Sequence, residues 1–269
     1  MTRTAQPSFD LSALVLTEDG HPEAFATVRL LIKSLLQVVD PRVAVQRIDF
    51  EPATDDHARR ASVANIWRST APGDRPSKIA LLREIAGKLV EPDGFVFFHF
   101  DGDTTWGNRK RCITAGQFRK IVQEGVRKTL RMRLAEQEYS DADAAEIIKN
   151  AMPRLLPVVP HYSIEAWCLQ NTALGRKLCA RHHGGAHSKD FDEWEADRGL
   201  LDEIEKPKNR ACLRDKHNKS LAGPGFPRDE ANKVDKSFAA TARAMGKCKA
   251  LTSALVTTYK NHEPASTRG

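Results

Sequence analysis

The sequence of 269 residues lacks any run of 18 or more apolar residues, so we expect no transmembrane helix. Its five cysteines are odd in number and never form a Cys-x-x-Cys pair, which favours a reduced, cytoplasmic protein without a disulfide framework. The first ten residues lack the apolar segment of a secretory signal. No P-loop motif occurs, so any use of ATP has to come from another chain.

The composition is that of a folded, soluble chain. Hydrophobic residues make up 41% and charged residues 29% of the sequence, which excludes the low hydrophobicity typical of intrinsic disorder. The length suits one large domain, or a core domain with a smaller one appended.

Positive charge is concentrated in one segment. The net charge is +7, but residues 109–133 alone contribute +8 and residues 202–269 a further +6, which leaves −7 on the remainder. Contact with a phosphate backbone requires such a basic segment, although a solvated helix face has the same composition. The candidates for nucleic-acid binding are Arg109, Lys110, Arg111, Arg119, Lys120, Arg127 and Lys128.

Short apolar runs alternate with segments of helical spacing. The runs predict buried strands at 12–17, 43–50, 95–100 and 155–159. The spacing predicts helices over 25–39, 77–89 (capped by Ser77), 115–138 and 164–170, and one that starts at Ser140. Strands alternating with helices imply crossover connections. We therefore expect an α/β, Rossmann-like fold: a mainly parallel sheet of about four strands flanked by helices.

Two further segments are predicted to contain no strand. Residues 51–76 are polar and interrupted by Pro and Gly, which predicts a loop with a turn of helix near Ile66. After residue 171 the pattern predicts helices at 193–205 and 229–260. The sequence thus favours an α/β catalytic domain over residues 1–170 and a mostly helical C-terminal region over residues 171–269.

Acidic residues follow three of the predicted strands. In an open α/β sheet, ligands gather outside the C-terminal ends of the strands. Carboxylates there can hold Mg²⁺, which activates water and stabilises the leaving oxygen of a phosphodiester. The structural alternative is that Asp and Gly form turns and that an acid favours a helix N-terminus. The candidates are Glu18, Asp19 and Glu23 after the first strand, Asp101 and Asp103 after the third, and Glu165 after the fourth.

The order of three segments, LVLTEDGHPEAF, FVFFHFDGDTT and VPHYSIEAW, resembles the Toprim fold. It is most similar to the small Toprim-like nucleases of the OLD and RloB kinds from bacterial anti-phage defence systems. The resemblance covers residues 12–170. Asp19-Gly20 with Glu23 matches the family's acid-Gly-x-x-Glu spacing; alternatively, Glu18 is the family glutamate and one residue is inserted.

The resemblance implies cleavage or nicking of nucleic acid, with DNA as the expected substrate and Mg²⁺ or Mn²⁺ as the cofactor. The implied metal ligands are Asp101, Asp103 and either Glu18 or Asp19, while Glu23 or Glu165 assists a second ion or acts as general base. The resemblance also implies a separate ABC-type ATPase partner that controls the nuclease. A homo-oligomer is compatible with this picture.

Three other functions compete with this one. Asp101-Gly102-Asp103-Thr104-Thr105 also fits the D-x-D-x-T signature of HAD-type phosphatases, in which the first Asp is the nucleophile. Asp19 stands before Gly20 where the Toprim family usually has Glu. This departure favours a non-catalytic binding or sensor module on a degenerate Toprim-like fold. An HNH-like nuclease would use His182, His183 and His217, but residues 176–220 show no paired strands.

A cluster of His and Cys residues raises the question of zinc. Its members are Cys179, His182, His183 and His187, with Cys212 and His217 further on, and such side chains bind zinc in many proteins. Gly184 and Gly185 interrupt the run, and no second tight pair completes a set of four ligands. We expect a polar loop here, with zinc as the alternative.

Overall fold

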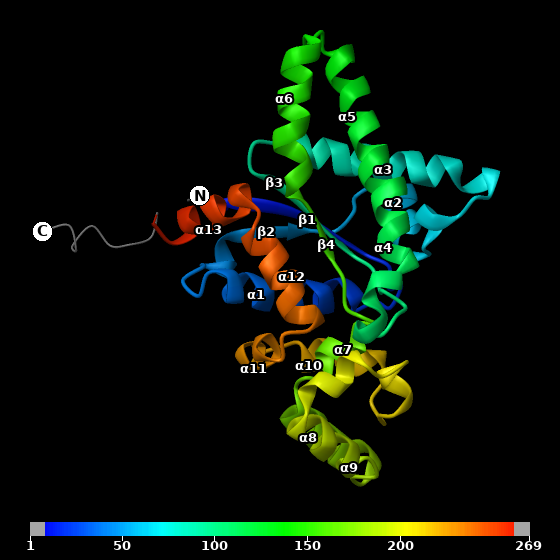
Figure 1. The fold of residues 1–269 in the computed structure, drawn as a ribbon, viewed down its shortest axis with the longest axis vertical. Helices are drawn as coiled ribbons and strands as arrows, with labels where there is room; N and C mark the ends of the chain where they lie inside the picture. The colour runs from blue at the N-terminus through cyan, green and yellow to red at the C-terminus, as the bar shows by residue number, and fades with distance from the viewer. Residues whose placement is uncertain (1–8, 261–269) are drawn as a thin grey trace, which may run out of the picture.

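The sheet of the computed structural model, which describes residues 9–260, has four strands in the order β2-β1-β3-β4, all parallel (Figure 1). The strands are β1 (Leu11–Thr17), β2 (Ile48–Glu51), β3 (Gly94–His99) and β4 (Leu155–Val158). The predicted α/β fold with a mainly parallel, helix-flanked sheet is therefore confirmed. The first eight residues, part of the segment that we expect not to form a secretory signal, lie outside the described residues.

The order of the strands creates a switch point between β1 and β3. From β1 the chain crosses to β2 on one side and then returns to β3 on the other side. All six residues of β3 are buried, and β3 pairs with β1 from Ser12↔Gly94 to Thr17↔His99. The residues that follow β1 and β3 therefore emerge side by side, where open α/β sheets bind their ligands.

Helices cover both faces of the sheet. On one face α1 (Ala24–Val39) packs with α12 (Ser237–Gly246) and α13 (Lys249–Lys260) in a core that includes Phe95 and Phe97. On the other face α2 (Asp56–Val63), α3 (Arg75–Val90), α5 (Glu124–Glu136) and α6 (Asp141–Ala151) cover Val96 and Phe98. Neighbouring residues of β3 thus serve opposite cores, because side chains alternate along a strand.

The basic segment forms one arm of a helical hairpin. The hairpin rises through α4 (Ile113–Gln117), a π-helical turn over Phe118–Gln123, and α5, and returns through α6 (Figure 1). The predicted helix over 115–138 is thus present, although it starts at Ile113 and contains the π turn. Ser140 accepts a hydrogen bond from the Asp143 N–H at 3.2 Å and caps α6 as predicted.

Residues 51–76 depart from the predicted loop. They contain α2, which Asp55 caps by accepting the Ala58 N–H at 2.9 Å, whereas the predicted turn near Ile66 is present as a 3₁₀ helix over Ile66–Arg68. Ser77 is not a cap, because α3 already begins at Arg75. The second strand is shorter than predicted, since residues 45–47 form a 3₁₀ turn.

The C-terminal region is helical, as predicted, but its helices are shorter and lie elsewhere. They are α7 (Glu165–Cys168), α8 (Thr172–His183), α9 (Ser188–Ala196), α10 (Asn218–Leu221), α11 (Arg228–Lys233), α12 and α13. The predicted helix at 193–205 is wrong, because α9 stops at Ala196 and 3₁₀ turns follow. The predicted helix at 229–260 is three helices, interrupted near Asp235 (φ 57°) and after Gly246.

Two buried polar networks hold distant segments together. The Arg154 guanidinium donates to the carbonyl oxygens of Leu89, Glu91, Pro92 and Gly94 at 2.5–3.0 Å and so joins the end of α3 to the start of β3. The Trp167 indole donates to Ser237 Oγ, which donates to Asp202 at 2.6 Å. Trp167 is therefore a core residue, and it also anchors α12.

The division at residue 170 stays a prediction. Buried residues from α1, the strands and residues 191–255 belong to one hydrophobic core, so the C-terminal region packs directly on the α/β layer. Of the helices in the described part of the chain, none has both the length and the apolar character needed to cross a membrane.

Candidate functional site

The predicted acidic residues meet at the switch point of the sheet. Glu18 and Asp19 follow β1, Asp101 follows β3, and Glu165 opens α7 shortly after β4. A cleft of about 190 Å³ is lined by these four residues together with Ser163, Ile164, Lys208 and Asp215. Sequence reasoning therefore placed four of its six acidic candidates in one cavity.

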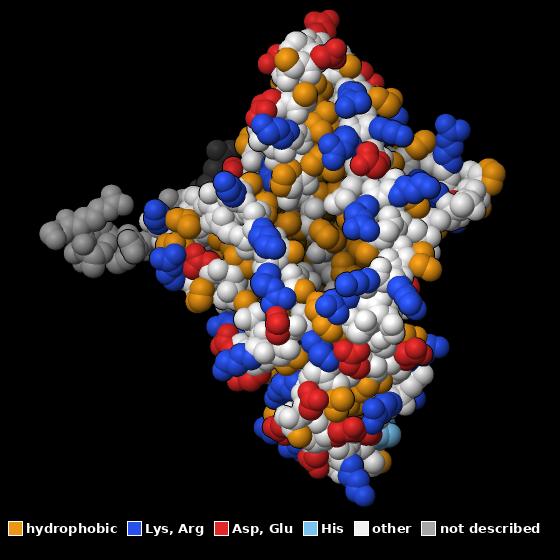
Figure 2. Space-filling model, in the orientation of Figure 1, with side chains coloured by type: hydrophobic (Ala, Val, Ile, Leu, Met, Phe, Trp, Pro, Cys, Tyr) orange, Lys and Arg blue, Asp and Glu red, His pale blue; other side chains and the backbone are white. Residues whose placement is uncertain are grey.

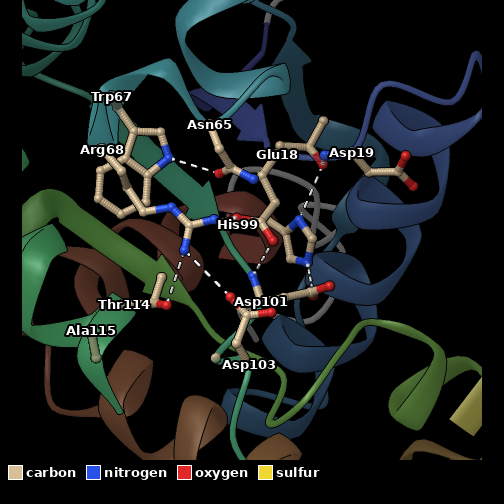
Figure 3. Close-up of polar contacts among 12 residues, drawn as sticks. Glu18, Asp19, Asn65, Trp67, Arg68, His99, Asp101, Asp103, Thr114 and Ala115 are labelled. Carbon is tan, nitrogen blue, oxygen red and sulfur yellow. Dashed lines mark hydrogen bonds and ion pairs between the residues drawn. The ribbon is translucent and has the colours of Figure 1, made fainter. Parts of the chain in front are cut away.

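Glu18 is tied to the backbone of the neighbouring strand end (Figure 3). Its Oε1 accepts the Asp101 N–H at 2.8 Å, while Oε2 lies 4.0 Å from Arg68 Nη2 and is buried without a hydrogen bond. Burial, with the charge of Asp101 close by, raises the pKa of Glu18 to about 7. Between the two candidates that the sequence leaves open, Glu18 is thus the one that faces Asp101.

Asp101 lies on the other side of this contact, against His99. The His99 Nε2 is 3.4 Å from Asp101 Oδ1, but neither atom makes a hydrogen bond. Burial, and then the charges of Glu165, Asp103 and Asp19, raise the pKa of Asp101 well above its usual value. His99 is itself buried, its Nδ1 lies 3.1 Å from Thr17 Oγ1, and burial lowers its pKa, which favours the neutral ring.

Glu165 is a buried member of the cleft. Its side chain is held by the C-terminal region, because Asn218 Nδ2 donates to Oε1 at 3.2 Å. Glu165 and Asp101 line the same cleft, and the charge of Glu165 contributes to the raised pKa of Asp101. The cleft thus depends on residues from both parts of the chain.

Two of the acidic candidates point elsewhere. Asp19 lines the cleft, but its Oδ1 accepts the His21 N–H at 2.9 Å, and its carboxylate is directed away from Glu18 (Figure 3). Glu23 is paired with Lys219 at 3.0 Å and does not line the cleft. Its position just before α1 agrees with the structural alternative, an acid at a helix N-terminus.

Asp103 lies at the rim, in an unusual backbone conformation. Its φ of 51° is left-handed, and its side chain is 60% exposed. Arg68 Nη1 donates to Asp103 Oδ2 at 3.3 Å and to Thr114 Oγ1 at 3.1 Å (Figure 3). The two Asp of the D-x-D therefore differ: Asp101 lies in the cleft, whereas Asp103 is held at its edge by an arginine.

The loop that carries the D-x-D is fixed by the loop after β4. Gly102 N–H donates to Pro160 O at 3.0 Å, and Asp103 N–H donates to Tyr162 O at 3.2 Å. A Cβ at Gly102 would lie 3.3 Å from Pro160 O, so glycine permits this close approach of the two backbones. The carboxylate of Asp101 is thereby held at a defined place relative to α7.

The carboxylates of the cleft suit a hard cation, although they do not form a complete cage. Among residues 9–260, no three His, Cys, Asp or Glu side chains stand in the geometry of a preformed metal site. Glu18 Oε2 and Asp101 Oδ1, however, are buried oxygens without a hydrogen-bond donor. Because Mg²⁺ binds through one or two carboxylates and otherwise through water and substrate oxygens, Glu18 and Asp101 fit Mg²⁺ or Mn²⁺.

The predicted nucleic-acid residues are all exposed. Figure 2 shows Lys and Arg side chains along the hairpin arm that contains α5, from the middle of the molecule toward the tip of the hairpin. Three of the candidates precede α4 on a 3₁₀ segment that begins at Trp106, and the Arg109 guanidinium lies 4.3 Å from the centre of the Trp106 ring. The exposed residues are Arg109, Lys110, Arg111, Arg119, Lys120, Arg127 and Lys128.

The His/Cys cluster does not form the expected polar loop. Helix α8 continues to His183, and Cys179 and Cys212 are buried. The rings of His182 and His217 are 5.5 Å apart, but within the described chain no set of three such side chains is placed to hold a metal. Residues 176–220 contain helices and 3₁₀ turns without the strands of an HNH-like site.

Several residues of this site were not predicted from the sequence, among them Asp215 in the cleft and the three residues Arg68, Lys208 and His99. Arg68 lies in the segment that was predicted to be a loop, and Lys208 lies far along the chain, so no local motif marks either residue. His99 is the last residue of β3, and the only feature of the sequence that points to it is its position two residues before Asp101. These three residues supply the cations and the imidazole that face the carboxylates.

Comparison with family models, with curated proteins and with solved structures gave no significant match. The chemistry of the site therefore has to be argued from its residues.

Proposed function

We propose that this protein is a metal-dependent nuclease that cleaves or nicks DNA. The observation that carries the proposal is the pair Glu18 and Asp101, two partly buried carboxylates at the switch point that each have one buried oxygen without a hydrogen-bond donor. Two such groups are costly to bury as anions, and a divalent cation between them offsets that cost. An exposed row of basic side chains next to the site supports a polyanionic substrate.

The residues divide the chemistry as follows. Glu18 and Asp101 would hold Mg²⁺ or Mn²⁺, which would activate water and stabilise the leaving oxygen of the phosphodiester. Arg68 lies 4.0 Å from Glu18 and Lys208 lines the cleft, and in this proposal the two cations contact the phosphate and orient it for attack. His99 contacts Thr17 through Nδ1, and its Nε2 faces Asp101 Oδ1 at 3.4 Å.

The other acidic residues have secondary roles in this proposal. Glu165 lines the cleft and is the candidate general base. Asp103, which lies 3.3 Å from Arg68 at the rim, would be a ligand of a second ion. Asp19 remains an alternative ligand at the cleft, whereas Glu23 assists only if its ion pair with Lys219 opens.

The basic row supplies the track for the substrate. Arg109, Lys110 and Arg111 follow the D-x-D in the chain, Arg119 and Lys120 lie on the π-helical turn, and Arg127 and Lys128 lie on α5. Side chains of this type bind phosphates without reading sequence, so they position the strand and do not select a cut site.

The biological setting of the proposal rests on the resemblance to Toprim-like nucleases of the OLD and RloB kinds. On that basis the protein is an effector of a bacterial anti-phage defence system, and a separate ABC-type ATPase controls its activity. A homo-oligomer is compatible with this role. Genes next to that of this protein provide the first check, and the absence of an ATPase gene would count against the defence role.

The proposal is tested by DNA cleavage with the purified chain, with and without the neighbouring ATPase. We expect cleavage only with Mg²⁺ or Mn²⁺, and loss of cleavage on substitution of Asp101→Asn or Glu18→Gln. The double substitution Asp101→Ala with Asp103→Ala also abolishes it. Asp141→Asn, which neutralises an exposed Asp at the start of α6, is the matched control and retains activity. Full activity in the double variant would contradict the metal site.

A non-catalytic binding module is the second candidate. It is favoured by Arg68, whose guanidinium lies 3.3 Å from Asp103 and 4.0 Å from Glu18 and so already supplies positive charge to the acidic residues. Retained DNA or partner binding without hydrolysis would favour this module. Turnover of a small phosphomonoester without cleavage of DNA would instead favour a phosphatase that uses Asp101 and Asp103.

A further inference from the structure

A second cavity opens on the far side of Asp19 from the carboxylate cleft. It has a volume of about 480 Å³ and lies between the turn that joins β1 to α1 and the residues of α2. Asp19 lines both cavities, so the two adjoin at this residue. Gly20 lies in the wall, where an added Cβ would come within 3.1 Å of the Val63 side chain of α2.

The wall of this cavity is apolar inside and charged at its edge. Leu16, Phe25, Ala53 and Val63 supply apolar surface, and Arg59 and Arg60 contribute exposed guanidinium groups from α2. Asp56 pairs with Arg59 within the same helix. Known ligand pockets have this size and this combination of apolar walls with a few polar groups.

The charge at the edge restricts the ligand. Two arginines from one turn of helix suit an anion, since guanidinium groups bind phosphate through paired hydrogen bonds. An apolar chamber that includes a phenylalanine suits a flat, aromatic body. A molecule with both properties is a nucleoside phosphate.

We infer that this cavity binds a nucleoside phosphate, with the base in the apolar chamber and the phosphate at Arg59 and Arg60. The choice of this ligand rests on the proposed nuclease function, because Asp19 joins the cavity to the cleft where a phosphodiester is cut. The nucleotide is either a unit of the DNA substrate next to the cleaved bond or a free nucleotide that occupies the cavity separately. Both sources present the same chemistry to the cavity.

Binding of a labelled deoxynucleoside monophosphate to the full chain tests the inference. We expect Arg59→Ala with Arg60→Ala to weaken binding by about tenfold or more, since two charge-assisted contacts are lost. Val63→Trp fills the chamber and has the same effect. The matched control is Arg75→Ala with Arg83→Ala, which removes two exposed arginines that line a different cavity and leaves binding unchanged.

A second arm identifies the source of the nucleotide. A short single-stranded oligodeoxynucleotide that displaces the monophosphate, and whose own binding is weakened by Val63→Trp, shows that the cavity holds a unit of the substrate. If the oligodeoxynucleotide binds without displacing the monophosphate, the ligand is a free nucleotide. Either result supports the inference.

The inference is separable from the nuclease proposal. Monophosphate binding that persists in Glu18→Gln and is lost in the Arg59/Arg60 variant supports the cavity even if no DNA is cut. Monophosphate that does not bind, or that binds equally to the wild-type protein and to the Arg59/Arg60 variant, overturns it even if DNA is cut. Because both arginines are exposed, this variant keeps the test valid if Val63→Trp does not fold.

Discussion

His99 connects, through a single buried imidazole, the two strand ends that carry the carboxylates. Its Nδ1 lies against Thr17 of β1 and its Nε2 faces Asp101 after β3. The sequence shows His99 only as the end of an apolar strand, and nothing local distinguishes it from a core histidine. Its role depends on the register Thr17↔His99, which is a property of the sheet.

Glu18 and Asp19 illustrate the limit of sequence reasoning at this scale. Adjacent residues of an extended chain point in opposite directions, so the end of β1 decides which carboxylate faces β3. The spacing of the family motif fits either residue, so it does not determine where β1 ends. The structure ends β1 at Thr17 and directs Glu18 toward Asp101.

Asp202 makes stability depend on pH. Burial raises the pKa of Asp202 to about 6, although Ser237 donates two hydrogen bonds to it. The folded chain therefore holds this proton more tightly than the unfolded chain. The protonated carboxyl of Asp202 therefore contributes at most about 3 kcal/mol to the free energy of unfolding. This contribution is present below about pH 4 and is lost as the pH rises through about 6.

We expect Asp202→Asn to remove this part of the pH dependence. Urea unfolding at pH 4.5 and pH 7 measures the difference, and the variant loses less stability over that range than the wild type. Glu203→Gln is the control, because Glu203 is more exposed and pairs with Lys236. An equal loss in the Asp202 variant and the wild type would show that other acids carry the effect.

Arg154 is the second residue with a large expected effect. Its guanidinium donates to four carbonyl oxygens between α3 and β3, and substitution by Met removes that donor from all four, although Glu91 O keeps the Gly94 N–H at 3.2 Å. We expect Arg154→Met to lower the free energy of unfolding by about 3 kcal/mol, with Arg154→Lys restoring only part of it. Urea unfolding measures both, and Lys149→Met on exposed α6 is the control. A loss below about 0.5 kcal/mol would contradict this role.

Among the helices and strands, those with the strongest local sequence patterns were predicted correctly. The apolar run of β3 and the Ser140 cap of α6 are present as predicted, because burial on both faces and a capping hydroxyl are local properties. Helix α2 was missed because Pro52 and a polar sequence precede it. Its small residues, such as Ala58 and Ala61, are buried by packing against α3, which the sequence does not show.

The basic arm α4–α5 has a measurable signature in salt. We expect substitution of Arg119, Lys120, Arg127 and Lys128 by Ala to flatten the dependence of log K for DNA binding on log salt, by about 3 units of slope. The reason is that each phosphate contact releases counterions. Binding titrations from about 50 to 200 mM salt measure the slope.

A matched control comes from the C-terminal region. It substitutes four exposed basic residues outside the arm, namely Lys177, Arg181, Lys189 and Lys216. We expect the slope to stay near that of the wild type in this variant. An unchanged slope in the arm variant would show that the row is a solvated helix face.

For the whole molecule, the C-terminal region completes both the core and the site. Asn218 holds Glu165, Lys208 lines the cleft, and α12 packs on α1. The sequence predicted a helical region here but gave no reason to place it against the carboxylates, because long-range packing leaves no local motif. The site could therefore be predicted as a set of acids but not as a closed cleft.

We expect a chain cut after Gln170 not to fold as an independent domain. Removal of residues 171–269 uncovers the apolar side of α1 and deletes the partner of Glu165. Circular dichroism, size-exclusion chromatography and urea unfolding of the fragment measure the outcome. A monomeric fragment with a cooperative unfolding transition would establish the division at residue 170 as a domain boundary.

Strand β4 forms one edge of the parallel sheet, and its residues affect whether a strand of another chain can pair with that edge. Val158 directs its carbonyl toward β3, where Phe100 N–H donates to it at 3.2 Å, so the neighbouring Pro157 directs its backbone toward the open edge. Proline has no N–H, so a strand of another chain that approached this edge would find no hydrogen-bond donor at Pro157. This edge is thus protected against the strand-to-strand aggregation that unpaired sheet edges invite.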